Sequence, residues 1–341
     1  MIDLRTDTVT RPTAGMRQAM ASAEVGDEQK GEDPTTRALE ERVASLLGTQ
    51  AAVFVPSATM ANQIALQLWS APGDGVVLSA GSHLVHSEAG GPAALAGLML
   101  QPITSSDGTF DAADLAAAAS EGAVEKPRTA IVSVENTHSN AGGRVWPTER
   151  LDAVVTAARR LEIRTHLDGA RLLNAALASS VAPDRIASQF DSATFCLSKG
   201  LGCPLGALLA LPAHHETQAR RIKQRLGGAM RQSGVLAAAG LYALDHHVDR
   251  LADDHRRAQR LADLLTQSAL GISAVDTNVV VLDTDAAGWD RALLLRRLAE
   301  EDVLLSAIPH PGRIRAVTHL DVDDDDVERA AAVILRVLAS R

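Results

Sequence analysis

Apolar and polar positions follow two alternating patterns along most of this chain. Short runs of apolar and β-branched residues have the length of buried strands, and the stretches between them favour helices. We predict strands at Ala51–Pro56, Val76–Ser79, Ala130–Val134, Arg164–Leu167, Ala193–Leu197 and Ala207–Leu211. We predict helices at Ala14–Ala23 and Pro34–Leu47, and a helical run from Met60 to Leu68. This alternation is typical of βαβ units and predicts an α/β fold with a large, mostly parallel sheet.

The pattern changes near residue 235. A single long helix rich in Ala, Leu, Arg and Asp is predicted from Val235 to Thr266, leading to a smaller domain. That domain has predicted strands at Asn278–Leu282, Val303–Ser306 and Ile314–Val317, and predicted helices at Trp289–Glu300 and Asp324–Leu338. We therefore expect an N-terminal arm at 1–14, a large domain at 15–245 and a smaller α+β domain at 246–341. The acidic run Asp321–Asp326 lacks the glycine and distal glutamate of an EF-hand, so we predict a helix start there.

Composition excludes several classes of partner. The 341 residues include 33 basic and 42 acidic side chains, and the net charge of −9 disfavours nucleic acid and anionic membranes. Aromatic residues make up only 2% of the chain, so few side chains could stack on single-stranded bases. Charges stand where a signal peptide needs an apolar run, and no segment has the length of a membrane span. Because Cys196 and Cys203 match no redox or zinc spacing, we expect free thiols and a cytoplasmic protein.

A carboxylate, a guanidinium and an amine follow two of the predicted strands. Asp168 and Arg171 stand in Leu167-Asp168-Gly169-Ala170-Arg171, and Lys199 stands in Ser198-Lys199-Gly200. A carboxylate can keep the ring nitrogen of pyridoxal 5′-phosphate protonated, and a lysine can bind that cofactor covalently through its neutral amine. Ligands of open α/β sheets lie beyond the carboxyl ends of strands. Each charge alone is better explained as a solvated surface group, but the three together indicate a pyridoxal phosphate site.

A second segment could hold the phosphate of that cofactor. Val55 to Asn62 combines a strand end, small hydroxyl residues and a helix start, whose backbone N–H groups can bind phosphate. The candidates are Ser57, Ala58 and Thr59, although an ordinary Ser or Thr helix cap explains this segment equally well on its own. The basic residues and paired glycines of Lys223–Arg231 could complete the phosphate site.

Other ligand classes fit the sequence less well. Gly200–Gly206 has the spacing G-x-G-x-x-x-G, which is one residue longer than the dinucleotide fingerprint and contains a proline. His83 and His86 have a zinc-like spacing without a convincing third ligand, so we expect no metal site. His83 and His138 lie at strand or loop ends, where an imidazole can contact a conjugated ring or carry a proton near neutral pH.

Together these segments resemble the L-threonine aldolase family, which belongs to the β-eliminating lyase group of fold type I pyridoxal phosphate enzymes. The resemblance runs nearly from end to end of the chain. It rests on the segments Asp3–Thr10, Val25–Asp27, Gly31–Thr35, Phe54–Ser57, Glu135–His138, His166–Arg171, Leu197–Gly202, Met230–Gln232 and Arg315–His319. It implies the aspartate aminotransferase-like fold and a pyridoxal 5′-phosphate cofactor.

The resemblance also implies roles for the matching residues. Lys199 corresponds to the lysine that forms a covalent aldimine with the cofactor, Asp168 to the partner of the ring nitrogen, and His83 to the imidazole stacked on the ring. Arg171 and Arg315 match the arginines that hold a substrate carboxylate. The further assignments are Ser57, Ala58, Thr59, Arg171 and Arg231 to cofactor binding, Thr6 to substrate binding, and His83 and His138 to transfer of the β-hydroxyl proton.

The chain departs from the usual family sequence at several positions. Thr6 replaces a serine and keeps the hydroxyl group, and Ala58 replaces a glycine in the phosphate segment. Gln224 replaces a lysine whose charge a neighbouring basic residue could supply. Lys30 and Ser87 stand where tyrosines are usual, which could reshape the pocket for the aldehyde portion of a substrate.

The resemblance implies cleavage of L-threonine, L-allo-threonine or a related β-hydroxy-α-amino acid to glycine and an aldehyde. The alternatives are another pyridoxal phosphate reaction on this scaffold, namely aldol transfer or β-elimination, and a non-catalytic subunit that binds the cofactor. The resemblance further implies a homotetramer, a dimer of dimers with shared active sites, in which Lys223–Arg231 reaches the phosphate of a neighbouring subunit. We expect a small amino-acid substrate and no nucleic-acid or membrane partner.

Overall fold

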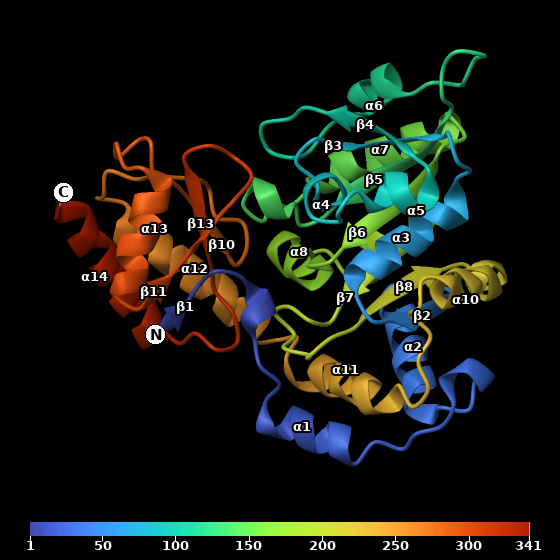
Figure 1. Ribbon diagram of the computed structural model, residues 1–341, viewed down its shortest axis with the longest axis horizontal. Coiled ribbons are helices and arrows are strands. Elements are labelled where there is room, and N and C mark those ends of the chain that lie inside the picture. Colours follow the sequence, from blue (N-terminus) through green and yellow to red (C-terminus); the bar gives the residue numbers. More distant parts are fainter. Residues whose placement is uncertain (341) are drawn as a thin grey trace.

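The larger of two lobes contains a seven-stranded sheet (Figure 1). The structure is a computed structural model and describes residues 1–340. The strands are β2 (Ala51–Val55), β3 (Gly75–Ser79), β4 (Met99–Ile103), β5 (Thr129–Glu135), β6 (Arg164–Gly169), β7 (Ser192–Cys196) and β8 (Ala207–Leu211). Their order is β2-β8-β7-β6-β5-β3-β4, with β8 antiparallel to both neighbours and the other pairs parallel. The predicted α/β class and the six predicted strands are confirmed.

The pattern of apolar residues misses β4, which lies at one edge of the sheet. Met99 is 57% exposed, and the strand contains a proline, Pro102. Proline removes a backbone donor and is tolerated on edge strands, where one side of the ladder is unpaired. An exposed edge strand therefore lacks the continuous apolar run that identifies its buried neighbours.

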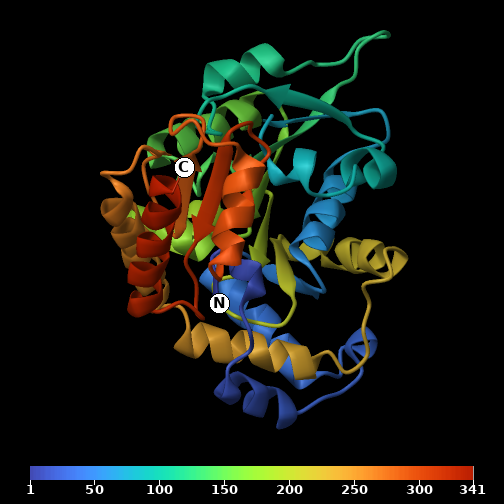
Figure 2. The ribbon, with the colours of Figure 1, turned by 60° about the vertical axis from the view of Figure 1, so that its left-hand side comes forward.

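Helices cover both faces of this sheet, which explains why its strands are continuously apolar. Successive side chains of a strand point to opposite faces. In β2, Val53 and Val55 pack with residues of α3 (Ala58–Trp69), whereas Phe54 packs with residues of α2 (Pro34–Leu46). The α3 face also carries α5 (Gly91–Ala96) and α10 (Glu216–Arg225), and the α2 face carries α7 (Thr148–Arg160), α8 (Leu172–Ser179), α9 (Pro183–Ala187) and α11 (Gly234–His246). The helix α1 (Ala14–Ala21) lies alongside α11 in both views (Figure 1 and Figure 2).

The C-terminal lobe is built on a second, four-stranded antiparallel sheet (Figure 1). Its strands are β9 (Gly271–Ile272), β10 (Val279–Asp283), β12 (Ser306–Ala307) and β13 (Arg313–Val317), and its helices are α12 (Leu251–Leu265), α13 (Arg291–Glu300) and α14 (Asp324–Ala339). The N-terminal strand β1 (Ile2–Asp3) pairs with β11 (Val303–Leu304), and Ile2 and Leu4 are buried in the core of this lobe. The N-terminal arm thus packs against the far end of the chain, and the exact domain limits stay a prediction.

The prediction of one long helix from Val235 to Thr266 is wrong. The chain forms α11 and α12 as separate helices, with a break between His246 and Leu251. At the break, the His247 ring bonds the carbonyl oxygen of Leu201, and Arg250 pairs with Asp254. These partners are supplied by tertiary structure, so the apolar pattern alone does not indicate the break.

The acidic run at 321–326 begins a helix, as predicted. Asp323 caps α14 and accepts from the backbone N–H of Asp326, whose side chain accepts from the N–H of Asp323 in return. This reciprocal cap satisfies two backbone donors, and the carboxylates of the first turn interact favourably with the helix dipole.

No helix within residues 1–340 is both long and apolar enough to cross a membrane.

Candidate active site

The predicted site residues follow four neighbouring strands of the large sheet. Asp168 lies in the last part of β6, Lys199 follows β7, and His83 opens the short helix α4 (His83–His86) after β3. Glu135 ends β5, and His138 follows it. Since β7, β6, β5 and β3 are parallel to one another, their carboxyl ends meet at one edge of the sheet.

Asp168 is 2% exposed and accepts hydrogen bonds at both oxygens. The backbone N–H of Ala170 donates to Oδ1 at 3.1 Å, and the Nδ2 of Asn62 donates to Oδ2 at 2.8 Å. The same Asn62 Nδ2 donates to Glu88 Oε1 at 2.8 Å. The Asn62 amide therefore lies between two buried carboxylates and uses both of its N–H donors on them.

A chain of buried hydrogen bonds fixes the orientation of that amide. Trp69 Nε1 can only donate, so it donates to Ser192 Oγ at 2.8 Å. Ser192 Oγ lies 2.9 Å from His166 Nδ1, and His166 Nε2 lies 3.0 Å from Asn62 Oδ1. Burial lowers the pKa of His166 to about 4, so its ring is neutral at neutral pH and donates only from Nε2, to Asn62. All hydrogen bonds of this series, from Trp69 to Asn62, are therefore donated in the direction of Asp168.

His83 is held by a second buried carboxylate. Its Nδ1 lies 2.9 Å from Glu88 Oε1, and the Glu88 side chain is fully buried and also accepts from Gln63 Nε2 at 2.7 Å. Burial opposes charge on the ring, but the Glu88 hydrogen bond and the charges of Asp168, Glu88 and Glu135 raise the pKa of His83. Its backbone N–H donates to Glu135 Oε2 at 2.7 Å. Because Nδ1 faces Glu88, Nε2 is the ring atom left for a substrate.

Ligand atoms of His83, Glu88 and Asp168 lie within 4.8 Å of one another, a spacing that a metal ion could bridge. The Asn62 Nδ2 group already lies between the two carboxylates and donates to both. An N–H donor in that position repels a cation and holds the two anions apart. The geometry therefore favours a hydrogen-bonded anion pair over a metal centre.

Lys199 lies in the loop after β7, partly buried. Its Nζ has no hydrogen bond or ion pair with any of residues 1–340, whereas its carbonyl oxygen accepts from Thr10 Oγ1 at 3.0 Å. Lys199 and Arg171 line the same small cavity. Within residues 1–340, the lysine amine therefore makes no direct contact with a carboxylate.

Arg171 and Arg315 converge on one hydroxyl group. Arg171 Nη1 and Arg315 Nη1 lie 3.2 Å and 3.1 Å from Ser139 Oγ. Arg171 is neutralised by Asp7, which accepts from its Nε and Nη2 at 2.6 Å each. Although burial opposes the charge on Asp7, the charges of Arg171 and Lys199 hold the pKa of that carboxyl well below its usual range. Burial and the neighbouring Arg171 lower the pKa of Arg315, which has no carboxylate partner within residues 1–340.

The phosphate segment has the expected geometry of a helix start. Ser57 caps α3 and accepts from the backbone N–H of Met60 at 3.2 Å. The N–H groups of Ala58 and Thr59 have no hydrogen-bond partner within the described chain. Ala58 is part of the helix, with no positive φ, so an alanine fits where the family usually has glycine.

No basic side chain of Lys223–Arg231 has a hydrogen bond or ion pair with residues 57–59 among the described residues. The Arg231 side chain is 62% exposed and bonds Gln29 and Asp27. The Lys223 ammonium is buried against Glu28, and Arg225 bonds Gln67. Both of these basic side chains thus have partners of their own within the described chain.

Four other residues singled out in the sequence lie in different surroundings. The His138 ring is 1% exposed, bonds Ser79 Oγ through Nε2 at 3.1 Å, and has a buried Nδ1 without a partner among the described residues. Thr6 caps a short 3-10 helix that begins at Asp7. Lys30 and Ser87 are exposed.

Sequence reasoning missed the residues that orient the site. They are Asp7, Asn62, Glu88, Glu135, Ser139 and His166, all of which bond a predicted site residue or the residue that holds it. Several stand inside the motifs that carry the family resemblance. Membership of such a motif was the available signal, but it does not indicate which partner each side chain contacts.

Comparison with known proteins agrees with this architecture. Residues 3–287 match the family model described as beta-eliminating lyase. The chain is 39% identical to low-specificity L-threonine aldolase 1 of Arabidopsis thaliana, over 96% of this chain and 93% of the relative. It is also 39% identical to the low specificity L-threonine aldolase of Escherichia coli K12, over 97% of this chain and 98% of the relative.

A solved structure shows the same fold. The threonine aldolase of Leishmania major superimposes with a TM-score of 0.85 at 20% identity, covering 99% of this chain and all of the other. The expected fold type I architecture is thereby confirmed. With the family model and the two relatives covering nearly the whole chain, this protein belongs to the beta-eliminating lyase family and, within it, to the L-threonine aldolases.

Proposed function

We propose that this protein is a pyridoxal phosphate-dependent lyase that cleaves L-threonine, L-allo-threonine or a related β-hydroxy-α-amino acid to glycine and an aldehyde. One arrangement carries the proposal. A buried carboxylate held by Asn62, an imidazole held by Glu88 and the Lys199 amine, which has no partner among residues 1–340, lie at the carboxyl ends of parallel strands in one sheet. The 39% identity to two low-specificity L-threonine aldolases supports this reaction over others of the same cofactor.

The residues present fit pyridoxal 5′-phosphate. Asp168 retains lone pairs for a protonated ring nitrogen, and Lys199 would bind the cofactor covalently. His83 would contact the ring. The N–H groups of Ala58 and Thr59, which have no partner among residues 1–340, would bind the phosphate together with the hydroxyl group of Thr59. When bound, the cofactor supplies an electron sink for the electron pair released as the Cα–Cβ bond breaks.

Arg315 would bind the substrate carboxylate. It is partly buried and has no anionic partner among residues 1–340, whereas Arg171 already pairs with Asp7. Arg171 Nη1 and Ser139 Oγ lie beside it and can complete the carboxylate site. Anchoring the carboxylate determines which bond at Cα is aligned for cleavage. Thr6, beside Asp7, stays a predicted substrate contact.

His83 would accept the proton of the β-hydroxyl group. Glu88 holds Nδ1, so neutral His83 presents Nε2 as the proton acceptor. His83 is also partly exposed, with a side-chain exposure of 31%, and therefore can be reached by a substrate. His138 is buried behind Ser79 and stays a prediction for this role.

The assembly and location of the protein belong to the same proposal. Family membership supports a homotetramer with shared active sites, and the exposed Arg231 is available to a neighbouring subunit. Both cysteines are free and buried, which suits a reducing compartment such as the cytoplasm.

The decisive experiment is to load the purified protein with pyridoxal 5′-phosphate and offer L-threonine, L-allo-threonine and L-phenylserine in parallel. We expect equal amounts of glycine and aldehyde from at least one substrate. Lys199→Ala should abolish both products, and Lys126→Ala, which changes an exposed lysine, should leave them unchanged. A keto acid with ammonia would indicate β-elimination, glycine transfer to a second aldehyde would indicate aldol transfer, and a loaded protein without any product would indicate a non-catalytic subunit.

A further inference from the structure

The backbone that follows β7 accepts hydrogen bonds from three side chains that lie far away in the sequence. Three consecutive carbonyl oxygens accept hydrogen bonds: Lys199 O from Thr10 Oγ1 at 3.0 Å, Gly200 O from Arg250 Nη1 at 3.4 Å, and Leu201 O from His247 Nδ1 at 2.8 Å. His247 and Arg250 both lie in the break between α11 and α12. The unexpected break in the long helix therefore places two donors directly on the segment that carries Lys199.

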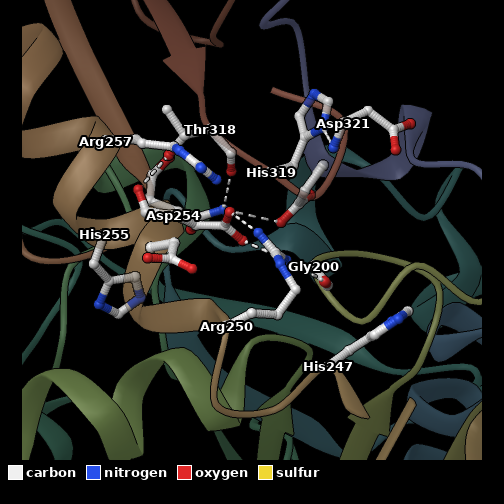
Figure 3. Close-up of polar contacts among 12 residues, drawn as sticks. Gly200, His247, Arg250, Asp254, His255, Arg257, Thr318, His319 and Asp321 are labelled. Carbon is white, nitrogen blue, oxygen red and sulfur yellow. Dashed lines mark hydrogen bonds and ion pairs between the residues drawn. The ribbon is translucent and has the colours of Figure 1, made fainter. Parts of the chain in front are cut away.

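Arg250 is itself held by a buried carboxylate. Its guanidinium pairs with Asp254, whose side chain is fully buried, through Nη1 at 3.2 Å and through Nη2. The carbonyl oxygen of Asp254 accepts from Thr318 Oγ1 at 2.6 Å, just after β13 of the C-terminal lobe. Figure 3 shows Arg250 between Asp254 and Gly200, with Thr318 and His319 beyond Asp254. Continuous contacts thus join the C-terminal lobe to the residue after Lys199.

Gly200 allows this close approach. A Cβ atom at Gly200 would lie 2.8 Å from Leu251 Cδ2 and 4.0 Å from Asp254 Oδ2. The loop is therefore packed directly against the first turn of α12. Because α12 also packs against α14, β10 and α8, it contacts both lobes.

We propose that His247 and the Arg250–Asp254 pair are positioning residues for Lys199, through which the C-terminal lobe determines where the lysine amine lies. The proposal rests on the proposed function, in which Lys199 binds the cofactor. None of the three side chains touches reacting atoms. They act on the peptide groups next to Lys199, and a shift of those groups displaces the amine at the end of the side chain. Small displacements of a reacting group cost much binding or rate, up to about 100-fold for 1 Å.

The first test separates this role from a purely structural one. Arg250→Met alone would leave Asp254 buried without a counterion, so the informative variant is the double substitution Arg250→Met with Asp254→Asn. The matched control is Arg256→Met with Asp324→Asn, which removes an exposed ion pair between α12 and α14. We expect the buried double variant to bind pyridoxal 5′-phosphate about tenfold more weakly and to shift the pH midpoint of the bound cofactor's absorption band, with no shift in the control.

The second test uses His247, so that the proposal stays testable if the double variant does not fold. His247→Leu removes the donor to Leu201, whereas His247→Gln retains an N–H group of similar reach. We expect His247→Leu to show the same two changes and His247→Gln to restore most of the wild-type values. Wild-type dissociation constants and pH midpoints in all folded variants would overturn the proposal.

A separate measurement on the wild-type protein tests the proposed function itself. Sodium borohydride makes a lysine–cofactor link permanent, and digestion with mass spectrometry then identifies the labelled lysine. A label on a lysine other than Lys199 would overturn the proposed function. A label on Lys199, combined with unchanged constants in the variants, would overturn only the positioning role.

Discussion

Asn62 Nδ2 donates to Asp168 Oδ2 at 2.8 Å, across 106 residues of sequence. Both groups are buried, and the amide orientation is determined on its other side by Thr194 Oγ1 and His166 Nε2, which lie 2.7 Å and 3.0 Å from Asn62 Oδ1. All four hydrogen-bonding positions of the amide are therefore used. Asp168 is held as an acceptor by a group that cannot rotate without losing four bonds.

Removing this amide should weaken cofactor binding. Asn62→Ala deletes the donor that separates Asp168 from Glu88 and orients Asp168. Hydrogen bonds to charged groups contribute about 1.5–3 kcal/mol, so we expect the dissociation constant for pyridoxal 5′-phosphate to rise about ten- to 100-fold. Titration of the apoprotein with pyridoxal 5′-phosphate, followed by absorbance, measures this dissociation constant. Gln67→Ala on the same helix is the control, and equal constants for both variants would contradict the role of Asn62.

Glu88 should determine the acid side of the pH–rate profile. The raised pKa of His83 means that its neutral, proton-accepting form is lost at a higher pH than for an ordinary histidine. In Glu88→Gln the negative charge is absent, so the acid limb of kcat/KM should move to lower pH. Profiles with L-threonine for the wild type, Glu88→Gln and the exposed control Glu149→Gln measure this. A limb that stays in place in Glu88→Gln would exclude His83 as the base.

Arg315 should act mainly on substrate binding. Arg315→Met removes a partly buried guanidinium that, unlike Arg171, has no carboxylate partner within residues 1–340. We expect KM for L-threonine to rise about tenfold or more, with a smaller change in kcat, because a charge-assisted hydrogen bond to the carboxylate is lost. Arg313→Met, two residues away on β13, is the control. If both variants kept the wild-type KM, the substrate carboxylate would have to bind elsewhere.

His166 should make folding stability depend on pH. Its pKa is lowered to about 4 in the folded protein and is about 6.5 when unfolded. Between these values the unfolded state binds more protons, so stability falls as pH drops from 6.5 to 4, by up to about 3 kcal/mol. Urea unfolding at several pH values measures this slope.

The same unfolding series provides the comparison. His166→Gln should lose this part of the pH dependence, although it will also be less stable at neutral pH because the chain to Asn62 is altered. His310→Gln, at an exposed position, should retain the wild-type slope. An unchanged slope in His166→Gln would show that the buried imidazole is not the titrating group.

Local pattern was sufficient to predict much of the fold. Buried strands are continuously apolar and short, so six of the seven large-sheet strands could be located, whereas the exposed β4 could not. The break between α11 and α12 escaped prediction because it depends on the contacts of His247 and Arg250 with residues about fifty positions earlier. The periodicity of apolar residues indicates which face of a helix is buried. Because α11 and α12 each have a buried face, the periodicity does not show where one helix ends and the next begins.

By itself, the sequence determined the alternation of strands and helices, the α/β class, and the placement of Asp168 and Lys199 at the ends of two strands, because these depend on residue type and short spacing. Only the tertiary structure decided that Asn62 lies between Asp168 and Glu88, that Asp7 pairs with Arg171, and that no carboxylate within residues 1–340 pairs with Arg315. The physical reason is that a buried polar group must find a partner, and the partner is supplied by whichever distant segment the fold brings within about 3 Å.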